Sequence, residues 1–372
     1  MDLPSWRDSG SRRAVVEFVE SVTRPGAAFV PPADRIAAFD NDGTLWVEQP
    51  APPQFDFLLR VWSQEARENP SLAERQPYKA IVERDPAFFE GLVTQDPDAV
   101  SSLESAAARS WAGTTPDVFE AQVRRWAETV KQPRFGVAYT DLVYRPMLEL
   151  FDYLKAHDFR VFVCSGGGRD FMRVFAEEIW GLPKENVIGT APAYEYTDGR
   201  IVRTDRMLGG LALGAGKPEH IYAHTGRLPL FAAGNADVDI EMLTTASFAL
   251  LISHDDAERE YAYTKAADTS LAKAEKLGWV VVSMKGDWSA VFSSMYDEWS
   301  LHGCHESIAD SSRSPAARDR SETSGGGGGP PGVARADGDR VVVGAHACDS
   351  SGAGRVMPSS DRARATALPG CR

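Results

Sequence analysis

Short apolar runs recur along the first 300 residues, and segments with a helical spacing of apolar side chains separate them. The runs are 36–39, 160–164, 230–233, 248–252 and 279–282. Each run is only four or five residues long, which is typical of a strand that is buried on both faces. Strands that alternate with helices in this way form a parallel sheet with helices on both sides. The pattern therefore predicts an α/β fold.

The helical spacing is clearest in the segment that precedes the second run. One face of this predicted helix carries Met147, Leu150, Phe151 and Leu154. Pro146 suits its first turn, because proline lacks an amide that the start of a helix would leave unpaired. The segment 194–202 has a different pattern, with an Asp-Gly pair between residues that favour strands. It predicts a β-hairpin.

The long segment between the first two runs contains no strand-like pattern. Helices are predicted at 55–67, at 78–93 and after Thr115. Thr115 is a suitable N-cap and Pro116 a suitable first helical residue. The third helix then carries apolar side chains at helical spacing, namely Phe119, Val123, Trp126 and Val130. We interpret residues 53–145 as a helical cap domain that is inserted into a sheet domain made of 1–52 and 146–300.

Residues 301–372 differ in composition from the rest of the chain. They contain no Phe, Trp or Tyr, and five successive glycines occupy 325–329. Such a segment cannot bury enough apolar surface to offset the entropy that is lost on ordering it. The composition therefore predicts a disordered C-terminal tail.

Charge and cysteine content narrow the function. The formal net charge of −13 argues against a nucleic acid or an anionic membrane as a partner. The four cysteines have no zinc or disulfide spacing, and no apolar run is long enough to span a membrane. The first residues also lack the apolar core of a signal peptide. We therefore expect a cytoplasmic enzyme with a small-molecule substrate; the pattern does not indicate its oligomeric state.

Two carboxylates follow the first apolar run, in the sequence FDNDGTLW at 39–46. Asp40 and Asp42 are two residues apart, so they project to the same side of an extended strand end. Ligands of open α/β sheets bind at this edge. Two close carboxylates have pKa values that are pushed apart, so that one can act as a nucleophile and the other as a general acid. Gly43 permits a sharp turn away from the strand. The pair suits phosphoryl transfer through an aspartyl-phosphate.

Later segments offer groups that would suit the same site. Ser165 and Gly166 close the second run and precede a predicted helix, where a hydroxyl and backbone amides could bind phosphate. Lys217 could offer a cation to the phosphate and to Asp40, although its surroundings are not those of a Walker A loop. The run at 230–233 is followed by Asn235 and Asp239, whose oxygens could bind Mg²⁺.

The order of these segments resembles the haloacid dehalogenase superfamily of hydrolases. The resemblance rests on four motifs: DxDGT at 40–44, a serine at a strand end (Ser165), a lysine (Lys217) and a GDxxxD-like segment at 234–239. The Ser-Gly-Gly sequence and a helical insertion between motifs one and two are similar to the phosphoserine-phosphatase-like branch. The resemblance implies a Rossmann-like core, a helical cap and Mg²⁺-dependent hydrolysis of the phosphomonoester of a small metabolite.

The resemblance also implies a role for each matched residue. Asp40 would be the nucleophile and a metal ligand, and Asp42 the general acid and base, with its backbone carbonyl on the metal. Ser165, Gly166 and Lys217 would bind the phosphoryl group. Asn235 stands where the family usually has an aspartate, and an amide oxygen can bind Mg²⁺ but brings no charge. The direct ligand therefore stays open among Asn235, Asp237 and Asp239.

Other functions remain to be weighed against hydrolysis. A dehalogenase would not need Asp42 as a proton donor, so the aspartate pair argues against it. A phosphotransferase or phosphomutase would use the same aspartyl-phosphate, and a non-catalytic protein could use the fold to bind phosphate. In the predicted cap, we expect aromatic residues such as Trp62, Trp111 and Trp126 to form a core rather than to contact substrate.

Overall fold

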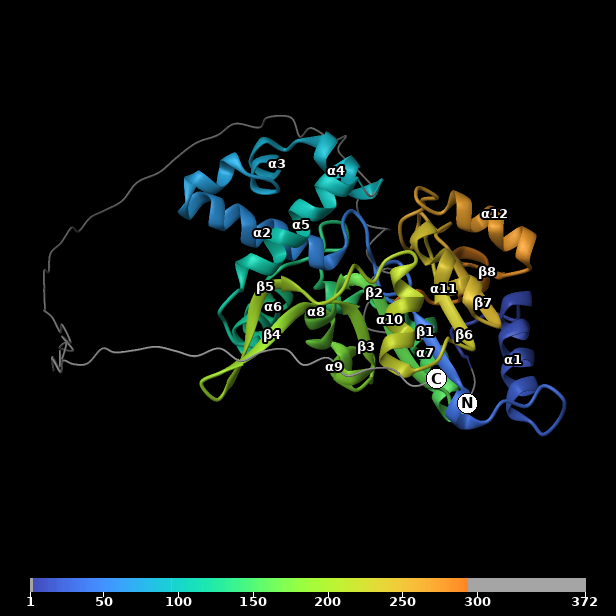
Figure 1. The fold of residues 1–372 in the computed structure, drawn as a ribbon. Helices are drawn as coiled ribbons and strands as arrows, with labels where there is room; N and C mark the ends of the chain where they lie inside the picture. The colour runs from blue at the N-terminus through green and yellow to red at the C-terminus, as the bar shows by residue number, and fades with distance from the viewer. Residues whose placement is uncertain (1–2, 95, 294–372) are drawn as a thin grey trace, which may run out of the picture. The chain divides into compact units, whose positions relative to one another are not determined.

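Six parallel strands form the central sheet of the computed structural model, which describes residues 3–94 and 96–293 (Figure 1). Their order is β3-β2-β1-β6-β7-β8. The bounds are β1 (Ile36–Phe39), β2 (Arg160–Gly168), β3 (Val187–Thr190), β6 (Phe231–Gly234), β7 (Phe248–Ser253) and β8 (Val280–Ser283). The sheet confirms the predicted α/β fold. The segment predicted to be a disordered tail, 301–372, lies outside the described residues.

Five of the six strands coincide with the apolar runs in the sequence. The exception is β3, which the sequence analysis did not predict. Its sequence, Val-Ile-Gly-Thr, has only two large apolar residues before a glycine, so it gives a weak strand signal. The strand forms because it pairs with β2 at the edge of the sheet. In this case tertiary pairing outweighs local propensity.

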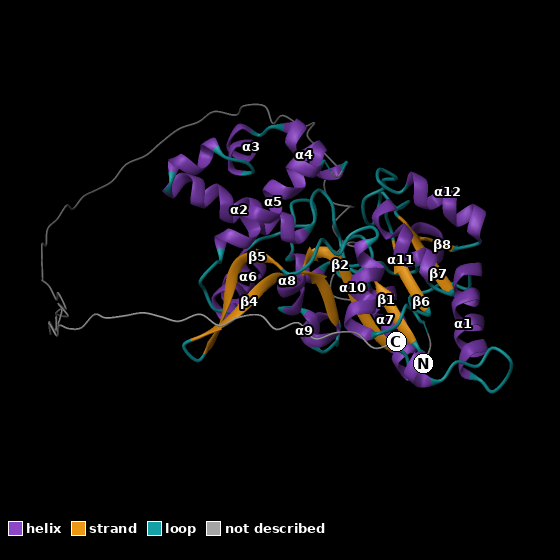
Figure 2. Cartoon of the chain, viewed as in Figure 1, coloured by secondary structure: helices purple, strands orange, loops and turns teal. Residues whose placement is uncertain are grey.

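Side chains alternate along each strand, and they enter two separate hydrophobic clusters. Ala37 and Phe39 belong to one cluster with side chains of α1 (Gly10–Thr23) and α7 (Arg145–Ala156). Ile36 and Ala38 belong to the other, with side chains of α10 (Gly216–Thr225), α11 (Ile240–Thr245) and α12 (Asp268–Leu277). Figure 2 shows helices around the strands in this arrangement. Because both faces of the sheet are covered, apolar residues predominate along its strands.

Helices occupy most of the segment between β1 and β2. They are α2 (Pro53–Glu68), α3 (Tyr78–Glu83), α4 (Pro86–Val93), α5 (Pro97–Ser110) and α6 (Pro116–Thr129). The single helix predicted at 78–93 is wrong, because two helices share this stretch. Arg84 is left-handed with a φ of 55°, and Asp85 caps a new helix with Pro86 at its first position. Thr115 does precede α6, but its side chain makes no capping hydrogen bond.

The inserted helices share a hydrophobic cluster with one face of the sheet. Phe57 of α2 and Trp126 of α6 both pack on Phe171, with ring centroids 5.7 and 5.5 Å apart. Phe171 belongs to α8 (Arg169–Arg173), the short helix that follows β2. Trp62 is fully buried among the inserted helices, as expected of a core residue. Aromatic packing therefore connects the insertion to the helix beside the strand-end serine.

The predicted hairpin is present as β4 (Pro192–Thr197) and β5 (Arg200–Met207). Asp198 and Gly199 form its turn, both with positive φ, which is the conformation that an Asp-Gly pair tolerates best. Backbone hydrogen bonds join Arg203 in β5 to the loop between α5 and α6, at Gly113 (2.8 Å) and Thr114 (2.9 Å). The hairpin is thereby fixed to the inserted helices.

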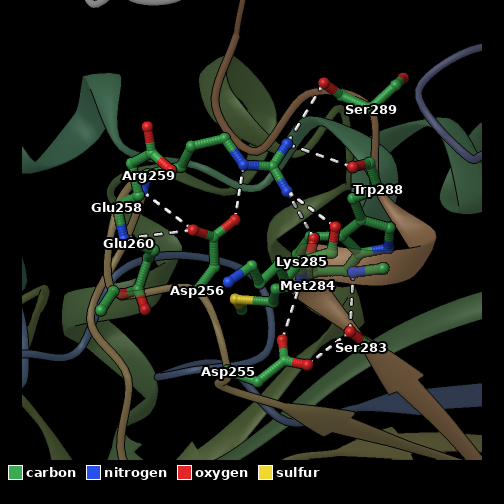
Figure 3. A network of polar contacts seen from close by, with 12 residues as sticks. Asp255, Asp256, Glu258, Arg259, Glu260, Ser283, Met284, Lys285, Trp288 and Ser289 are labelled. Carbon is green, nitrogen blue, oxygen red and sulfur yellow. Dashed lines mark hydrogen bonds and ion pairs between the residues drawn. The ribbon is translucent and has the colours of Figure 1, made fainter.

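The segment 254–263, after β7, is held by one arginine. The Arg259 guanidinium donates hydrogen bonds to the carbonyl oxygens of Met284 (2.7 Å) and Trp288 (3.1 Å) and pairs with the Asp256 carboxylate (Figure 3). Met284 begins α13 (Met284–Asp287), and α9 (Ala176–Ile179) completes the α-helices of the described part. Among the residues described, no helix is long and apolar enough to cross a membrane.

Candidate active site

The strand order reverses between β1 and β6. The chain passes from β1 outward to β2 and β3 and then returns to β6 on the other side of β1. Loops that leave β1 and β6 therefore diverge and leave a crevice at the carboxyl ends of the strands. Asp40 directly follows β1 and Asn235 directly follows β6. The topology thus brings the first and fourth sequence motifs together.

A tight turn follows β1 and depends on Gly43. The amide of Asp40 still belongs to the sheet and donates to the Ala233 carbonyl (2.9 Å). Gly43 has a φ of +76°, and a β-carbon at this position would lie 2.1 Å from Asn235 Nδ2. Both the backbone conformation and the available space therefore require glycine. The close approach allows residues on the turn to contact the loop after β6.

Lys217 links the two loops through its charge. It lies in the first turn of α10, is fully buried, and its Nζ forms ion pairs with Asp40 Oδ1 and Asp239 Oδ1. Burial would lower the pKa of Lys217, but the two carboxylates outweigh it and raise this pKa. Burial and the Asp239 charge raise the pKa of Asp40, against the effect of Lys217. One ammonium therefore holds two buried carboxylates in place.

Asp239 uses both carboxylate oxygens within the protein. Oδ1 contacts Lys217, and Oδ2 accepts hydrogen bonds from the backbone amides of Asn235 (2.9 Å) and Ala236 (3.0 Å). Asp237 is directed elsewhere, because its Oδ1 accepts from the amide of Ser270 (2.7 Å). Of the three residues that the sequence left open as metal ligands, Asn235 is the one whose side chain contacts the turn after β1.

Asp42 is held differently from Asp40. Its Oδ1 accepts a hydrogen bond from the Trp46 indole (2.8 Å), and its side chain lines a pocket. Burial raises the pKa of Asp42 to about 6, and the hydrogen bond from Trp46 opposes this shift. No pattern in the sequence indicated that Trp46 would orient this carboxylate. Asp40 thus pairs with a lysine, whereas Asp42 is held by an indole N–H and lines a pocket.

Ser165 lies close to Asp42. It is buried, and its Oγ accepts a hydrogen bond from the amide of Gly167 (3.1 Å). A β-carbon at Gly167 would lie 3.3 Å from Ser165 Oγ and 3.8 Å from Asp42 Oδ2. The expected helix start at this point is wrong, because β2 continues through a bulge to Gly168 and α8 begins at Arg169. Gly166 lines the same pocket as Asp42.

Glu48 is a site residue that the sequence analysis missed. Its Oε1 accepts hydrogen bonds from Asn235 Nδ2 (2.9 Å) and from the hydroxyl of Tyr263. Asn235 Oδ1 in turn accepts from Thr44 Oγ1 (3.1 Å). Burial raises the pKa of Glu48, while His254, Tyr263 and Asn235 lower it. The one sequence signal was an acidic residue placed directly after the apolar stretch 45–47.

A buried polar network supports the turn from behind. His254 Nε2 lies 2.8 Å from the Gly43 carbonyl, and Nδ1 lies 3.1 Å from Glu260 Oε2. The hydroxyl of Tyr144 donates to the other oxygen of Glu260 (3.1 Å). His254, Glu260 and Tyr263 all belong to the segment that Arg259 fixes to α13 and the residues after it (Figure 3). The position of Glu48 therefore depends on a rigid segment after β7.

The oxygen atoms at the switch point are of the type that Mg²⁺ prefers. Within 3–94 and 96–293, no three His, Cys, Asp or Glu side chains converge as a metal-binding group. The oxygen donors include the Asp40 carboxylate and the amide oxygen of Asn235, and the Glu48 carboxylate is hydrogen-bonded to the same asparagine. Mg²⁺ commonly binds to one or two carboxylates and completes its shell with water and phosphate. This donor set fits Mg²⁺.

A pocket of about 240 Å³ opens beside Asp42. The inserted helices α2, α5 and α6 and the hairpin strand β5 contribute to its walls, together with the glycines at the end of β2. Trp111 belongs to the hydrophobic core, as expected, and it also lines this pocket. Its ring is nearly fully buried against Phe57 and Phe119, so it serves packing as well.

A family model for haloacid dehalogenase-like hydrolases matches residues 37–244, which is more than half of the chain. The chain belongs to the haloacid dehalogenase-like hydrolase family. The match includes the two aspartates, Ser165, Lys217 and the loop after β6. A search of curated protein sequences found no match.

The chain is also similar to solved structures. A conserved protein of unknown function from Anaerococcus prevotii DSM 20548 is 15% identical, with a TM-score of 0.51, over 76% of this chain and 94% of its own. A protein of unknown function from Bordetella pertussis Tohama I is 17% identical (TM-score 0.44; 67% and 98% covered). A probable phosphoserine phosphatase from Vibrio cholerae is 14% identical (TM-score 0.38; 68% and 61% covered). Only the first has a TM-score above 0.5, and it supports the fold alone.

Proposed function

We propose that this hydrolase cleaves phosphomonoesters of small molecules through an aspartyl-phosphate on Asp40. The proposal rests on one observation, which is that the two aspartates have different surroundings. Asp40 is buried against the Lys217 ammonium, whereas Asp42 is held by an indole N–H at the wall of a pocket. A nucleophile and a proton donor need such different surroundings. A dehalogenase would have no use for the second aspartate.

The first half of the reaction would transfer the phosphoryl group to the protein. A carboxylate oxygen of Asp40 attacks phosphorus, and the bond from phosphorus to the leaving oxygen breaks. Asp42 donates its proton to that oxygen, so the alcohol leaves in neutral form. The Lys217 ammonium offsets negative charge beside Asp40, and the Ser165 hydroxyl and the amide of Gly166 would donate hydrogen bonds to the phosphoryl oxygens.

The second half of the reaction would release phosphate. Asp42, now ionised, accepts a proton from a water molecule, whose oxygen attacks phosphorus. The bond between phosphorus and Asp40 breaks, which restores the free carboxylate and a protonated Asp42. Water must therefore reach the side of the phosphorus that the alcohol has left, which is the side of the pocket beside Asp42.

Asp40, Asp42 and Asn235 would hold Mg²⁺, through a carboxylate, a backbone carbonyl and an amide oxygen respectively. When bound, the cation would neutralise charge on the phosphoryl group. We infer that Glu48 supplies the negative charge that Asn235 lacks, because its carboxylate is hydrogen-bonded to that amide. Asp239 would position the loop rather than bind the metal, since Lys217 and two backbone amides already occupy its oxygens.

A phosphatase assay over a panel of phosphomonoesters, with Mg²⁺ and with EDTA, tests the proposal. We expect release of inorganic phosphate that depends on Mg²⁺. A crystal structure with beryllofluoride and Mg²⁺ should show the adduct on Asp40. Transfer of the phosphoryl group to an added alcohol in place of water would instead indicate a phosphotransferase. Binding of phosphate without turnover of any ester would identify a non-catalytic protein.

A further inference from the structure

The pocket beside Asp42 has walls that are mainly hydrocarbon. Its apolar lining includes Phe55, Leu58, Leu103, Trp111, Phe119 and Met207. Because Asp42 lies on the same wall, a leaving group whose oxygen receives a proton from Asp42 would extend into this space. A small polar leaving group such as serine would leave these apolar surfaces unfilled. The lining therefore favours an alcohol with a substantial apolar part.

The volume of the pocket limits the size of this alcohol. The pocket measures about 240 Å³. A protein cavity of about 150 Å³ can hold a benzene molecule. The pocket can therefore hold one ring with a short substituent, or an aliphatic chain of similar volume.

Four charged side chains line the pocket, and only two of them form an ion pair with each other. Arg203 pairs with Asp170, and its guanidinium lies 4.3 Å from the centre of the Phe119 ring. These two charges cancel each other within the wall. Asp42 is held by Trp46 and is assigned to proton transfer. The fourth charged residue of the lining, Glu104, thus determines the net charge that an occupant meets.

Glu104 projects from α5 and is half-buried. Within the described part of the chain it makes no hydrogen bond or ion pair, and burial alone raises its pKa, with no cation to lower it. A half-buried carboxylate between apolar walls is costly unless a partner compensates it. A cationic group on the occupant would compensate the Glu104 carboxylate.

We propose that this pocket binds the alcohol half of a phosphomonoester that joins a hydrocarbon body, ring-bearing or aliphatic, to a protonated amine. The hydrocarbon packs between α2, α5 and α6, and the ammonium group faces Glu104. The inference rests on the proposed phosphatase activity and adds the chemical class of its substrate. It also distinguishes the substrate from phosphoserine, whose leaving group is small and polar.

Three para-substituted benzyl phosphates test the proposal, because their substituents lie far from the reacting oxygen and change its basicity little. They are 4-(aminomethyl)benzyl, 4-methylbenzyl and 4-carboxybenzyl phosphate, with phosphoserine as the small polar comparison. We expect kcat/KM to fall in that order across the series, with the cationic ester about 10-fold above the neutral one. Phosphoserine should be a poorer substrate than the neutral ester.

Glu104→Gln is the decisive variant, since it removes the charge and keeps the shape. It should bring the cationic and neutral esters to equal kcat/KM, because it removes the advantage of the cationic ester. Asp98→Asn is the matched control, because Asp98 lies in the first turn of the same helix but outside this pocket. It should preserve the preference for the cationic ester.

The possible failures are distinguishable. Equal kcat/KM for the cationic and neutral esters in the wild type would overturn the role of Glu104. A preference for phosphoserine over every benzyl ester would overturn the apolar assignment. Absence of phosphate release from all four esters with Mg²⁺ present would contradict the proposed hydrolase activity itself.

Discussion

The candidate site has two ends, the switch point of the sheet and the pocket beside Asp42, and their polar groups differ in whether they have partners within the protein. At the switch point of the sheet, Lys217, Asp239 and Asn235 all have partners within the protein, and the partners come from different loops. In the pocket beside Asp42, hydrocarbon dominates the lining and Glu104 has no partner in the described part of the chain. A group that must be positioned for chemistry is fixed by its neighbours. A group that selects a ligand, in contrast, is left without a partner in the protein so that it can bind the ligand.

The switch point and the pocket are also formed by different segments of the chain. At the switch point, Asp40 and Asn235 directly follow strands β1 and β6, which pair with each other in the sheet, and Lys217 lies in the first turn of α10. The pocket takes its walls largely from the helices inserted after β1 and from the β4–β5 hairpin. Variation in the insertion can therefore change the occupant of the pocket without disturbing the strand ends. The predictions below use substitutions at each end to separate chemistry from selection.

The largest effect is expected at Asp40. Asp40→Asn should abolish turnover of every phosphomonoester, because an amide does not attack phosphorus. The exposed Asp34→Asn is a control for the loss of one charge near the same strand, and it should retain full activity. Activity is measured as phosphate release, and folding of both variants by circular dichroism. Near-normal turnover in a folded Asp40→Asn protein would rule out this nucleophile.

Asp42→Asn should slow turnover by about 100-fold or more, since Asp42 is the group that we propose donates a proton to the leaving oxygen. The loss should shrink for aryl phosphates, whose leaving groups depart without much protonation. Comparison of benzyl and 4-nitrophenyl phosphate in both proteins measures this difference. A loss of the same size for both esters would argue that Asp42 only maintains the shape of the site.

At the other end, Leu103→Gln should lower kcat/KM for 4-methylbenzyl phosphate by about 10-fold, because it replaces a hydrocarbon contact in the pocket with a polar one. Methyl phosphate does not reach the pocket and should be hydrolysed as before. Val82→Gln makes the same kind of change at an exposed site on α3 and should affect neither ester. Equal losses for the two esters would mean that the pocket and the switch point are not separable.

The smallest effect concerns the charge beside Asn235. Glu48→Gln should weaken Mg²⁺ binding by about 10-fold, as expected when a partner of a metal ligand is lost. Isothermal titration calorimetry measures this affinity without substrate. Tyr263→Phe removes the other hydrogen bond to Glu48 Oε1 but keeps its charge, so it should weaken Mg²⁺ binding less.

Moving the charge sharpens the same test. Asn235→Asp alone places a second carboxylate against Glu48, and the two would repel each other. The double variant Glu48→Gln with Asn235→Asp transfers one negative charge from residue 48 to residue 235. It should recover most of the affinity that Glu48→Gln loses. If the double variant binds Mg²⁺ no better than Glu48→Gln, Glu48 does not compensate for the asparagine.

Local patterns in the sequence were sufficient for much of the fold. Strand β1 and helix α7 could be predicted because strands buried on both faces are continuous apolar runs and helices repeat every 3.6 residues. The sequence failed at β3, whose apolar run is too short, and at Arg84, where one predicted helix is two. Strand β3 forms because it pairs with β2, and the helix is interrupted by the left-handed backbone at Arg84. Neither feature produces a periodic pattern of apolar residues.

The sequence by itself also indicated the residues that we propose to carry the chemistry of the site. Asp40, Asp42, Ser165 and Lys217 are recognisable because they follow strands or open a helix in a fixed order. Those positions are set by the direction of the strands, which the apolar runs already define. A parallel sheet brings their carboxyl ends to one edge, wherever they occur in the chain.

Only the tertiary structure decided how these residues are supported and what the site can select. Glu48 reaches Asn235, Trp46 holds Asp42, and Arg203 neutralises Asp170, and in each case the contact depends on a turn or on two segments far apart in sequence. Glu104 is one carboxylate among many in the sequence, and only the packing of three helices and a hairpin leaves it unpaired in a pocket. No periodic pattern encodes such a contact, because it arises from the way distant segments pack.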